Sequence, residues 1–139
     1  MIKSISEILA EASEKATIEE RVDVLHKHNS EVLQGVLKIA HTPGIKFKLP
    51  EGTPPFNPYK GYDNEGVLYA EWRKMYLFIE GMSNDNLSDQ KRQLMFVQLL
   101  ESLTPSEVKL IIALKDKKFN YPKINKRVVN KAYPGLLGD

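Results

Sequence analysis

Apolar residues in the first part of the chain recur at intervals of three and four, which is the period of an amphipathic α-helix. The segment SISE (residues 4–7) places a serine at a helix N-cap with a glutamate three residues later, and TIEE (17–20) repeats this capping-box pattern. A third helix is predicted to begin near Asn29 or Ser30 and to end before Pro43. The three apolar stripes are Ile5, Ile8, Leu9 and Ala12, then Ile18, Val22 and Leu25, then Val32, Leu33, Val36, Leu37 and Ala40.

Residues 42–63 interrupt this pattern with five prolines and three glycines. Within them IKFKL (45–49) alternates and predicts a short extended piece, but the prolines exclude a helix or a central strand. A long loop in a compact domain is uncommon unless it is functional, disordered or packed down by its own side chains. We therefore expect the aromatic residues to anchor the segment as an extended wrap over the helices. These aromatics are Phe47, Phe56, Tyr59 and Tyr62.

Helical spacing resumes after Asp63. A long helix is predicted over 64–80, with Gly81 at its C-cap. A fifth helix is predicted over 88–102, apolar over so much of its circumference that it should be central. Aromatics at helical spacing usually serve burial, so we interpret Trp72 and its neighbours as core rather than as a base-stacking surface. The apolar residues of these helices are Leu68, Tyr69, Trp72, Met75, Tyr76 and Ile79, then Leu94, Met95, Phe96, Val97, Leu99 and Leu100.

The segment TPSE predicts the start of a sixth helix, with Thr104 as N-cap, Pro105 at the first helical position and Glu107 completing a capping box. Asn125 caps a short last helix, which ends at Pro134. The predicted core faces are Val108, Ile111 and Ile112, then Val128, Val129, Ala132 and Tyr133. The chain is therefore predicted to be all-α, a compact bundle of six or seven helices with a Pro-rich extended wrap (about 42–63), in a single helical domain over 1–139.

Composition narrows the class of protein. The 139 residues are 42% hydrophobic and 27% charged, which is typical of a soluble globular chain, and no run of 18 apolar residues predicts a membrane span. The absence of cysteine excludes disulfides and thiolate metal sites and fits a reducing cytosol. The net charge of +2 hides an asymmetry, because residues 115–131 carry seven basic groups and one acidic group while the remainder carries 13 basic and 17 acidic groups.

Candidate catalytic and metal-binding residues are few. His26 and His28 are two positions apart and point in different directions on a helix, so only Asp23 and His26 share a face, and a catalytic zinc site usually needs three protein ligands. The phosphate-binding glycine loop and the nucleophile elbow are both absent from the sequence. We therefore predict no metal, no cofactor and no catalytic residues, and interpret the protein as not an enzyme, with an enzyme acting on a small molecule as the third hypothesis.

The basic segment KDKKFNYPKINKRVVNK (115–131) is the candidate binding site for a partner or for nucleic acid. Its cations would neutralise phosphates and its aromatics would stack on an unpaired base. The same cations would also suit an acidic protein partner. In the third interpretation the lysines finish one helix and solvate another, and the aromatics hold the turn against the core. The candidate residues are Lys115, Lys117, Lys118, Phe119, Tyr121, Lys123, Lys126, Arg127 and Lys131.

Four stretches, LPEGTPPFNP, LYAEWRKMYLFIEG, QLLESLTPSE and KDKKFNYPKINKRVVNKAYPGLL, resemble segments of a family of small uncharacterised proteins encoded by large tailed bacteriophages. The similarity spans roughly residues 25–137, and AYPGLL and KDKK are its most distinctive pieces. The resemblance implies a viral protein that acts in the cytoplasm of an infected bacterium. It assigns no activity and no functional residues.

From these observations we expect a non-enzymatic phage accessory protein that binds another macromolecule. A protein partner is the leading expectation, with the polymerase machinery of host or phage, in transcription or replication, as the example that analogy supplies. The alternative is a nucleic-acid-binding protein that uses residues 115–131. No membrane partner is expected, and the oligomeric state stays open because the apolar stripes can be buried within one chain.

Overall fold

The first three helices begin at the caps that the sequence predicts. The computed structural model describes residues 4–57, 67–80 and 87–137. Ser4 forms a complete capping box, because its Oγ accepts from the Glu7 N–H over 3.2 Å while its own N–H donates to Glu7 Oε1 over 3.3 Å. Thr17 and Ser30 cap the next two helices with their side-chain oxygens. These helices are α1 (Ile5–Glu14), α2 (Ile18–Lys27) and α3 (Glu31–His41).

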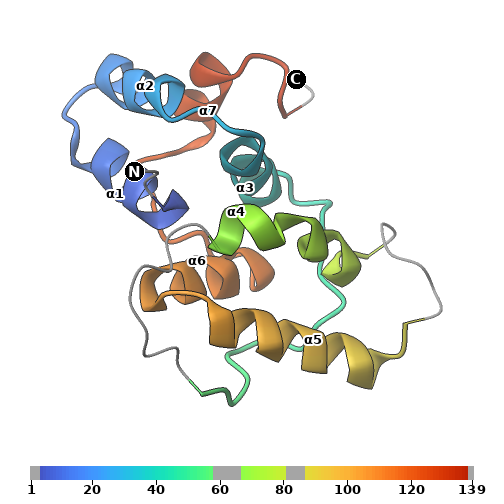
Figure 1. Cartoon of the computed structure of the whole chain (residues 1–139). Helices are drawn as coiled ribbons and strands as arrows, with labels where there is room; N and C mark the ends of the chain where they lie inside the picture. Colours follow the sequence, from blue (N-terminus) through green and yellow to red (C-terminus); the bar gives the residue numbers. More distant parts are fainter. Residues whose placement is uncertain (1–3, 58–66, 81–86, 138–139) are drawn as a thin grey trace.

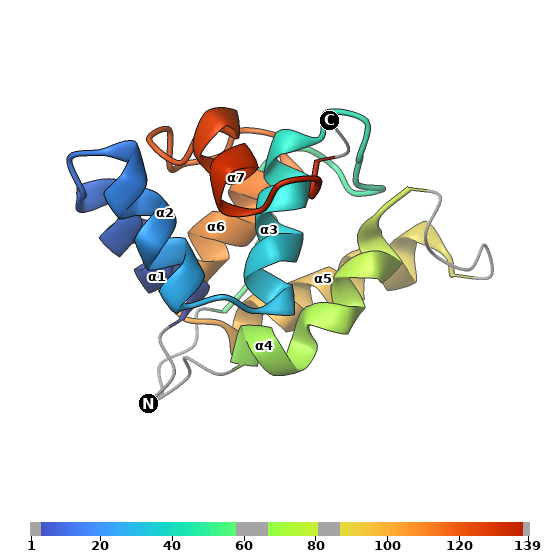
Figure 2. The same ribbon diagram turned by 90° about the horizontal axis from the view of Figure 1, so that it is seen from above.

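The helices pack as a bundle in which α3 and α6 are central (Figure 1). In Figure 2 the hairpin of α1 and α2 lies on one side of this pair, and α4 and α5 lie on the other. The last helix, α7, returns to pack on α2, so the end of the chain closes the bundle beside its beginning. The remaining elements are α4 (Val67–Glu71), the 3-10 helix η1 (Trp72–Phe78), α5 (Asp89–Ser102), α6 (Pro105–Lys115) and α7 (Lys126–Ala132).

The hydrophobic core is continuous and takes residues from every helix of the bundle. Its most deeply buried members include Ile5, Leu25, Leu37, Leu68, Phe78, Leu100, Ile111 and Val128. The residues that the structure describes form helices and an isolated β-bridge, with no sheet among them. The predicted all-α fold is therefore confirmed.

The long helix predicted over 64–80 is wrong in its second half. The chain leaves α-geometry at Trp72 and continues as a 3-10 helix, whose three residues per turn place Trp72, Met75 and Phe78 on one buried line. It then becomes extended at Ile79, which bridges to Phe47. Hydrogen bonds on either side of this bridge, 2.7 Å each, join residues 46–48 to 78–80. The extended piece IKFKL is thus confirmed, and its pairing ends the helix. The predicted start at residue 64 and the cap at Gly81 lie outside the described residues.

The helix predicted to be central, α5, instead lies on one side of the bundle (Figure 2) and is buried along one stripe. Leu94 is 58% exposed, while Met95 and Val97 are half-buried. The residues that face the core are Arg92, Phe96, Leu99 and Leu100, spaced as one helical stripe. Arg92 is buried because its guanidinium donates to the Leu77 carbonyl over 3.1 Å, to the Leu87 carbonyl over 3.2 Å and to Asp89 over 2.9 Å.

The start of α6 keeps the predicted positions but not the predicted cap. Thr104 is extended and Pro105 occupies the first turn, yet the Thr104 hydroxyl makes no capping hydrogen bond. Glu107 is instead fully buried, and its charge, together with that of Glu7, adds to the burial that raises the pKa of Tyr69. The capping box predicted for TPSE is therefore not formed. Asn125, by contrast, caps α7 as predicted, with its Oδ1 accepting from the Val128 N–H over 3.1 Å.

Candidate interaction surface

Lys115, the first residue of the basic segment, is directed into the fold. Its side chain is 1% exposed, and its ammonium donates to the Pro50 carbonyl over 2.7 Å and to the Asp116 carboxylate over 2.5 Å. Asp116 in turn accepts from the Gly52 N–H over 3.2 Å. Burial raises the pKa of Asp116, but the hydrogen bonds from Lys115 and Gly52 and the charges of Lys115 and Lys118 outweigh it and lower the pKa overall. Lys115 and Asp116 together clamp residues 50–52 onto the end of α6.

Lys117 terminates two helices at once. Its φ of 59° places it in the left-handed region that ends α6, where its N–H donates to Leu114 and the next N–H donates to Ala113. Its ammonium donates to the carbonyls of Ile39, over 2.8 Å, and Thr42, over 3.1 Å, at the end of α3. Partial burial lowers the pKa of Lys117. A cation suits this position because the C-terminus of a helix carries partial negative charge.

The two aromatics of the basic segment lie next to each other and pack against the bundle. The Phe119 ring meets His41 edge-on, with centroids 5.3 Å apart, and lies 5.8 Å from the ring of Tyr121. The Tyr121 hydroxyl donates to the Ser6 carbonyl over 3.3 Å. This arrangement matches the interpretation in which the aromatics hold the turn against the core.

The other cations of the segment are exposed. Lys118 pairs with Glu51 over 3.3 Å, and Lys131 approaches Glu19 at 3.8 Å. The side chains of Lys123, Lys126 and Arg127 are exposed around the start of α7. The structure therefore does not gather the nine predicted site residues into one patch, because the Lys115 side chain is buried and the ammonium of the exposed Lys117 is hydrogen-bonded to the end of α3.

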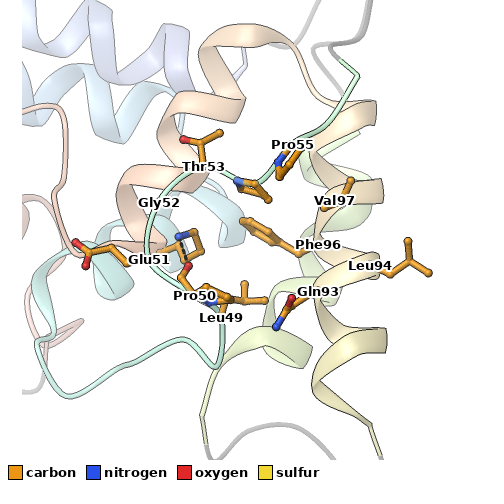
Figure 3. A pocket seen from close by; sticks show the side chains of 12 residues that line it. Leu49, Pro50, Glu51, Gly52, Thr53, Pro55, Gln93, Leu94, Phe96 and Val97 are labelled. Atoms are coloured by element: carbon orange, nitrogen blue, oxygen red, sulfur yellow. Dashed lines mark hydrogen bonds between the residues drawn. The ribbon is translucent and has the colours of Figure 1, made fainter.

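A hollow that we call the α5-side hollow lies between the Pro-rich segment (residues 49–57) and α5. It has a volume of about 410 Å³. Phe96 projects from α5 toward the Pro-rich segment, whereas Leu94 projects away from that segment (Figure 3). The lining consists of Leu49, Pro50, Glu51, Gly52, Thr53, Pro54, Pro55, Gln93, Leu94, Phe96, Val97 and Lys115.

A second hollow, the α6-side hollow, lies on the other side of the same segment. Its volume is about 580 Å³, and it shares Thr53 with the first hollow. Ile112, predicted to be core, is only half-buried here, so α6 presents apolar side chains to the core and to this hollow. The lining consists of Thr53, Phe56, Pro105, Val108, Lys109, Ile112, Ala113, Asp116, Lys118 and Asn120.

The Pro-rich segment that separates the hollows is held along its length. Besides the clamp at its start, the Asn57 N–H donates to Glu101 of α5 over 2.9 Å, and Phe56 packs half-buried against the core. The predicted wrap is thus confirmed over its described part. The predicted anchors Tyr59 and Tyr62 lie outside the described residues.

The sequence reasoning missed both hollows. The signal was the surplus of apolar residues on α5 and α6, which exceeds what one core-facing stripe of each helix requires. The sequence pattern assigns these residues to the core. In the structure Leu94 is exposed and Ile112 is half-buried, and each lines one of the two hollows.

The histidines contact other segments of the chain. His26 donates through Nε2 to the Ala132 carbonyl over 2.6 Å, and His41 to the Ile124 carbonyl over 2.9 Å. His28 approaches Glu11 at 3.8 Å. Among the residues that the structure describes, no group of three His, Cys, Asp or Glu side chains is arranged to hold a metal ion. Within the same residues, no helix has the length and apolar character needed to cross a membrane.

The comparisons with known proteins identify a family. A family model described as "Family of unknown function (DUF6433)" matches residues 8–121. The chain belongs to this family. A comparison with curated proteins finds no match. The DUF6433 match runs from α1 through α6 to Tyr121, so it includes the Pro-rich segment and all residues that line the two hollows. The matched range ends before α7, and therefore before Lys123, Lys126, Arg127 and Lys131.

Proposed function

We propose that this member of the DUF6433 family is a non-enzymatic accessory protein that binds a protein partner through the docking face, by which we mean the two hollows and the Pro-rich segment between them. The observation that carries the proposal is the exposure of apolar side chains there. Within the part of the chain that the structure describes, Leu94 is the exposed large hydrophobic residue, and it lines this face. Apolar patches of this kind on soluble proteins mark interaction sites.

The clamped Pro-rich segment supports the same proposal. Two apolar hollows on either side of a held ridge make a preformed surface, and preformed surfaces bind with a smaller loss of conformational entropy. Lys115 and Asp116 hold Pro50 and Gly52 of the Pro-rich segment in place by hydrogen bonds, so this part of the surface is formed before a partner binds. The resemblance to proteins of large tailed bacteriophages supports an infected bacterium as the setting and its cytoplasm as the location. It makes the transcription or replication machinery of host or phage the partner to examine first.

A capture experiment tests the proposal. The tagged chain is recovered from lysates of phage-infected bacteria, beside Leu94→Glu, which places a charge at the edge of the α5-side hollow, and Ala113→Arg, which places one in the α6-side hollow. Gln98→Glu, an exposed position of α5 outside both hollows, is the matched control. We expect one stoichiometric protein on the wild-type chain and on the control, and its loss from at least one hollow variant. The same proteins on all four chains, or no partner on any, would overturn the proposal.

The exposed cations around α7 favour nucleic acid as a second candidate. Lys123, Lys126 and Arg127 are all exposed within a short stretch. Against it, Lys115 and Lys117 are engaged with backbone carbonyls and Tyr121 with Ser6, which leaves fewer groups to contact phosphates and bases. Binding of a 20-nucleotide oligodeoxythymidine that weakens steeply with salt and is lost on Lys126→Glu would favour this candidate.

A further inference from the structure

We infer that the α6-side hollow binds a partner segment in which acidic residues flank a large apolar side chain. The inference rests on the proposed function and adds the chemistry of the partner to it. Three features of the hollow carry it, namely its apolar walls, the cations at its edge and the neutralised state of its acidic residue.

The walls of the hollow are mainly apolar. Val108, Ile112 and Ala113 of α6 form one side, and Phe56 and Pro105 complete it. Leu110, Ile111 and Leu114 of the same helix are buried in the core, as is Val108, whereas Ile112 and Ala113 are only half-buried and stay partly accessible in the hollow. A space of about 580 Å³ is large enough to take bulky apolar side chains.

The edge of the hollow is basic. Lys109 on α6 and Lys118 after its end are both exposed and line the hollow. Lys118 is paired with Glu51, but both side chains are more than 70% exposed, at 73% and 74%, so this ion pair contributes little and a partner carboxylate can replace Glu51.

The acidic residue in the lining does not offset these cations. The carboxylate of Asp116 accepts from the Lys115 ammonium and from the Gly52 N–H, and Lys115 supplies the charge that balances it. With this pair neutral, the charged groups that remain in the lining are Lys109 and Lys118, and the exposed Glu51 faces Lys118 from outside the lining. Electrostatic complementarity therefore selects an acidic segment over a basic one.

Nucleic acid fits the hollow less well than an acidic peptide. Sequence-tolerant binding of single strands uses several aromatic faces for base stacking, and Phe56 is the aromatic residue in this lining. The cations are lysines, which lack the planar fork with which arginine grips phosphate. An aliphatic groove with charged edges is the form that receives an amphipathic peptide.

Selection from a random 12-residue peptide library displayed on phage, against the full chain, tests the inference. Ala113→Arg serves for counter-selection, because arginine keeps the helix and fills the hollow with a cation. Enriched peptides are then synthesised with a fluorophore, and their Kd is measured by anisotropy. We expect peptides with Asp or Glu beside Leu, Ile, Phe or Trp, and weaker binding by about threefold to fivefold for each of Lys109→Glu and Lys118→Glu. Lys123→Glu, outside the hollow, is the matched control, and thermal unfolding confirms that each variant folds.

The other outcomes separate the two proposals. Peptides that need Ala113 but show no preference for acidic residues overturn the inference and leave the docking face as proposed. Peptides indifferent to Ala113→Arg and to Leu94→Glu overturn the inference and the docking face together. Salt-dependent binding of the 20-nucleotide oligodeoxythymidine that is lost on Ala113→Arg, with no acidic peptide enriched, assigns the hollow to nucleic acid and overturns the inference.

Discussion

The ammonium of Lys115 and the carbonyl of Pro50 lie 2.7 Å apart, although the two residues are 65 positions apart in the sequence. This hydrogen bond and the adjacent contact of Asp116 with Gly52 hold the Pro-rich segment against the end of α6. A lysine that looks like a surface cation in the sequence is thus a structural element of the proposed docking face.

Replacing Lys115 with methionine should destabilise the fold. Methionine fills the same space but leaves the Pro50 carbonyl without its donor and the Asp116 carboxylate without its cation, which should lower the free energy of unfolding by about 3 kcal/mol. Urea unfolding followed by circular dichroism measures it. Lys118→Met, at an exposed position, should change stability by less than about 0.5 kcal/mol. Equal losses of unfolding free energy in the two variants would show that the hydrogen bonds of Lys115 do not stabilise the fold.

Leu94 and Phe96 are two positions apart on α5, but substitutions at the two should change the free energy of unfolding by very different amounts. Leu94→Gln should alter the free energy of unfolding by less than about 0.5 kcal/mol, because the side chain is largely exposed. Phe96→Ala should lower it by about 3 to 5 kcal/mol, because the ring is buried and packs against Phe78 with centroids 5.3 Å apart. Comparable losses in urea unfolding would instead support the predicted central position of α5.

The helix caps and the burial of Arg92 show why the sequence predicts some features and not others. The caps at Ser4, Thr17 and Asn125 were predicted correctly because a cap depends on side chains within a few residues. The burial of Arg92 depends instead on the Leu77 carbonyl, which only the folded chain brings close. Local patterns therefore predicted the helices, while tertiary contacts decided which faces are covered.

The position of the candidate site likewise depends on tertiary contacts that local sequence patterns do not contain. Charge density marked residues 115–131, but density along the chain does not say where a side chain points. The direction of Lys117 is set by the end of α3, far away in sequence, and the hollows form only when the Pro-rich segment lies between α5 and α6. Local sequence patterns are sufficient to divide residues 115–131 into a helix end, an anchored turn and a capped last helix. They are not sufficient to predict the hollows.

Gly35 should not tolerate alanine, although it lies in the interior of α3 where alanine is usually favoured. A Cβ at Gly35 would lie 2.6 Å from Cζ2 of the buried Trp72 ring, so the ring would have to shift. We expect Gly35→Ala to lower the free energy of unfolding by about 1 to 3 kcal/mol despite its better helix propensity. Gly44→Ala is the matched control, because a Cβ there meets nothing within 4 Å. Thermal unfolding that shows Gly35→Ala as stable as Gly44→Ala would contradict this close approach.

Stability should fall as His41 becomes protonated. Burial lowers the pKa of His41 from 6.5, and the charges of Lys126 and Lys117 lower it further, although the hydrogen bond to Ile124 opposes them. The folded state thus binds the proton less readily than the unfolded state, so this stabilisation is complete above pH 6.5 and is lost as the pH falls below it. The experiment compares urea unfolding of the wild type with that of His41→Gln, whose amide can still donate to Ile124. From about pH 7 to about pH 5 the wild type should lose more stability than the variant. Parallel losses would exclude His41 as the source.

Residues 124–133 complete the bundle by contacting helices that are synthesised first. The carbonyls of Ile124 and Ala132 accept from His41 and His26, and α7 packs on α2. The N-terminal hairpin therefore cannot reach its final environment until this segment has emerged from the ribosome. A nascent chain stalled before residue 124 therefore exposes the side of α2 that α7 covers to chaperones and proteases.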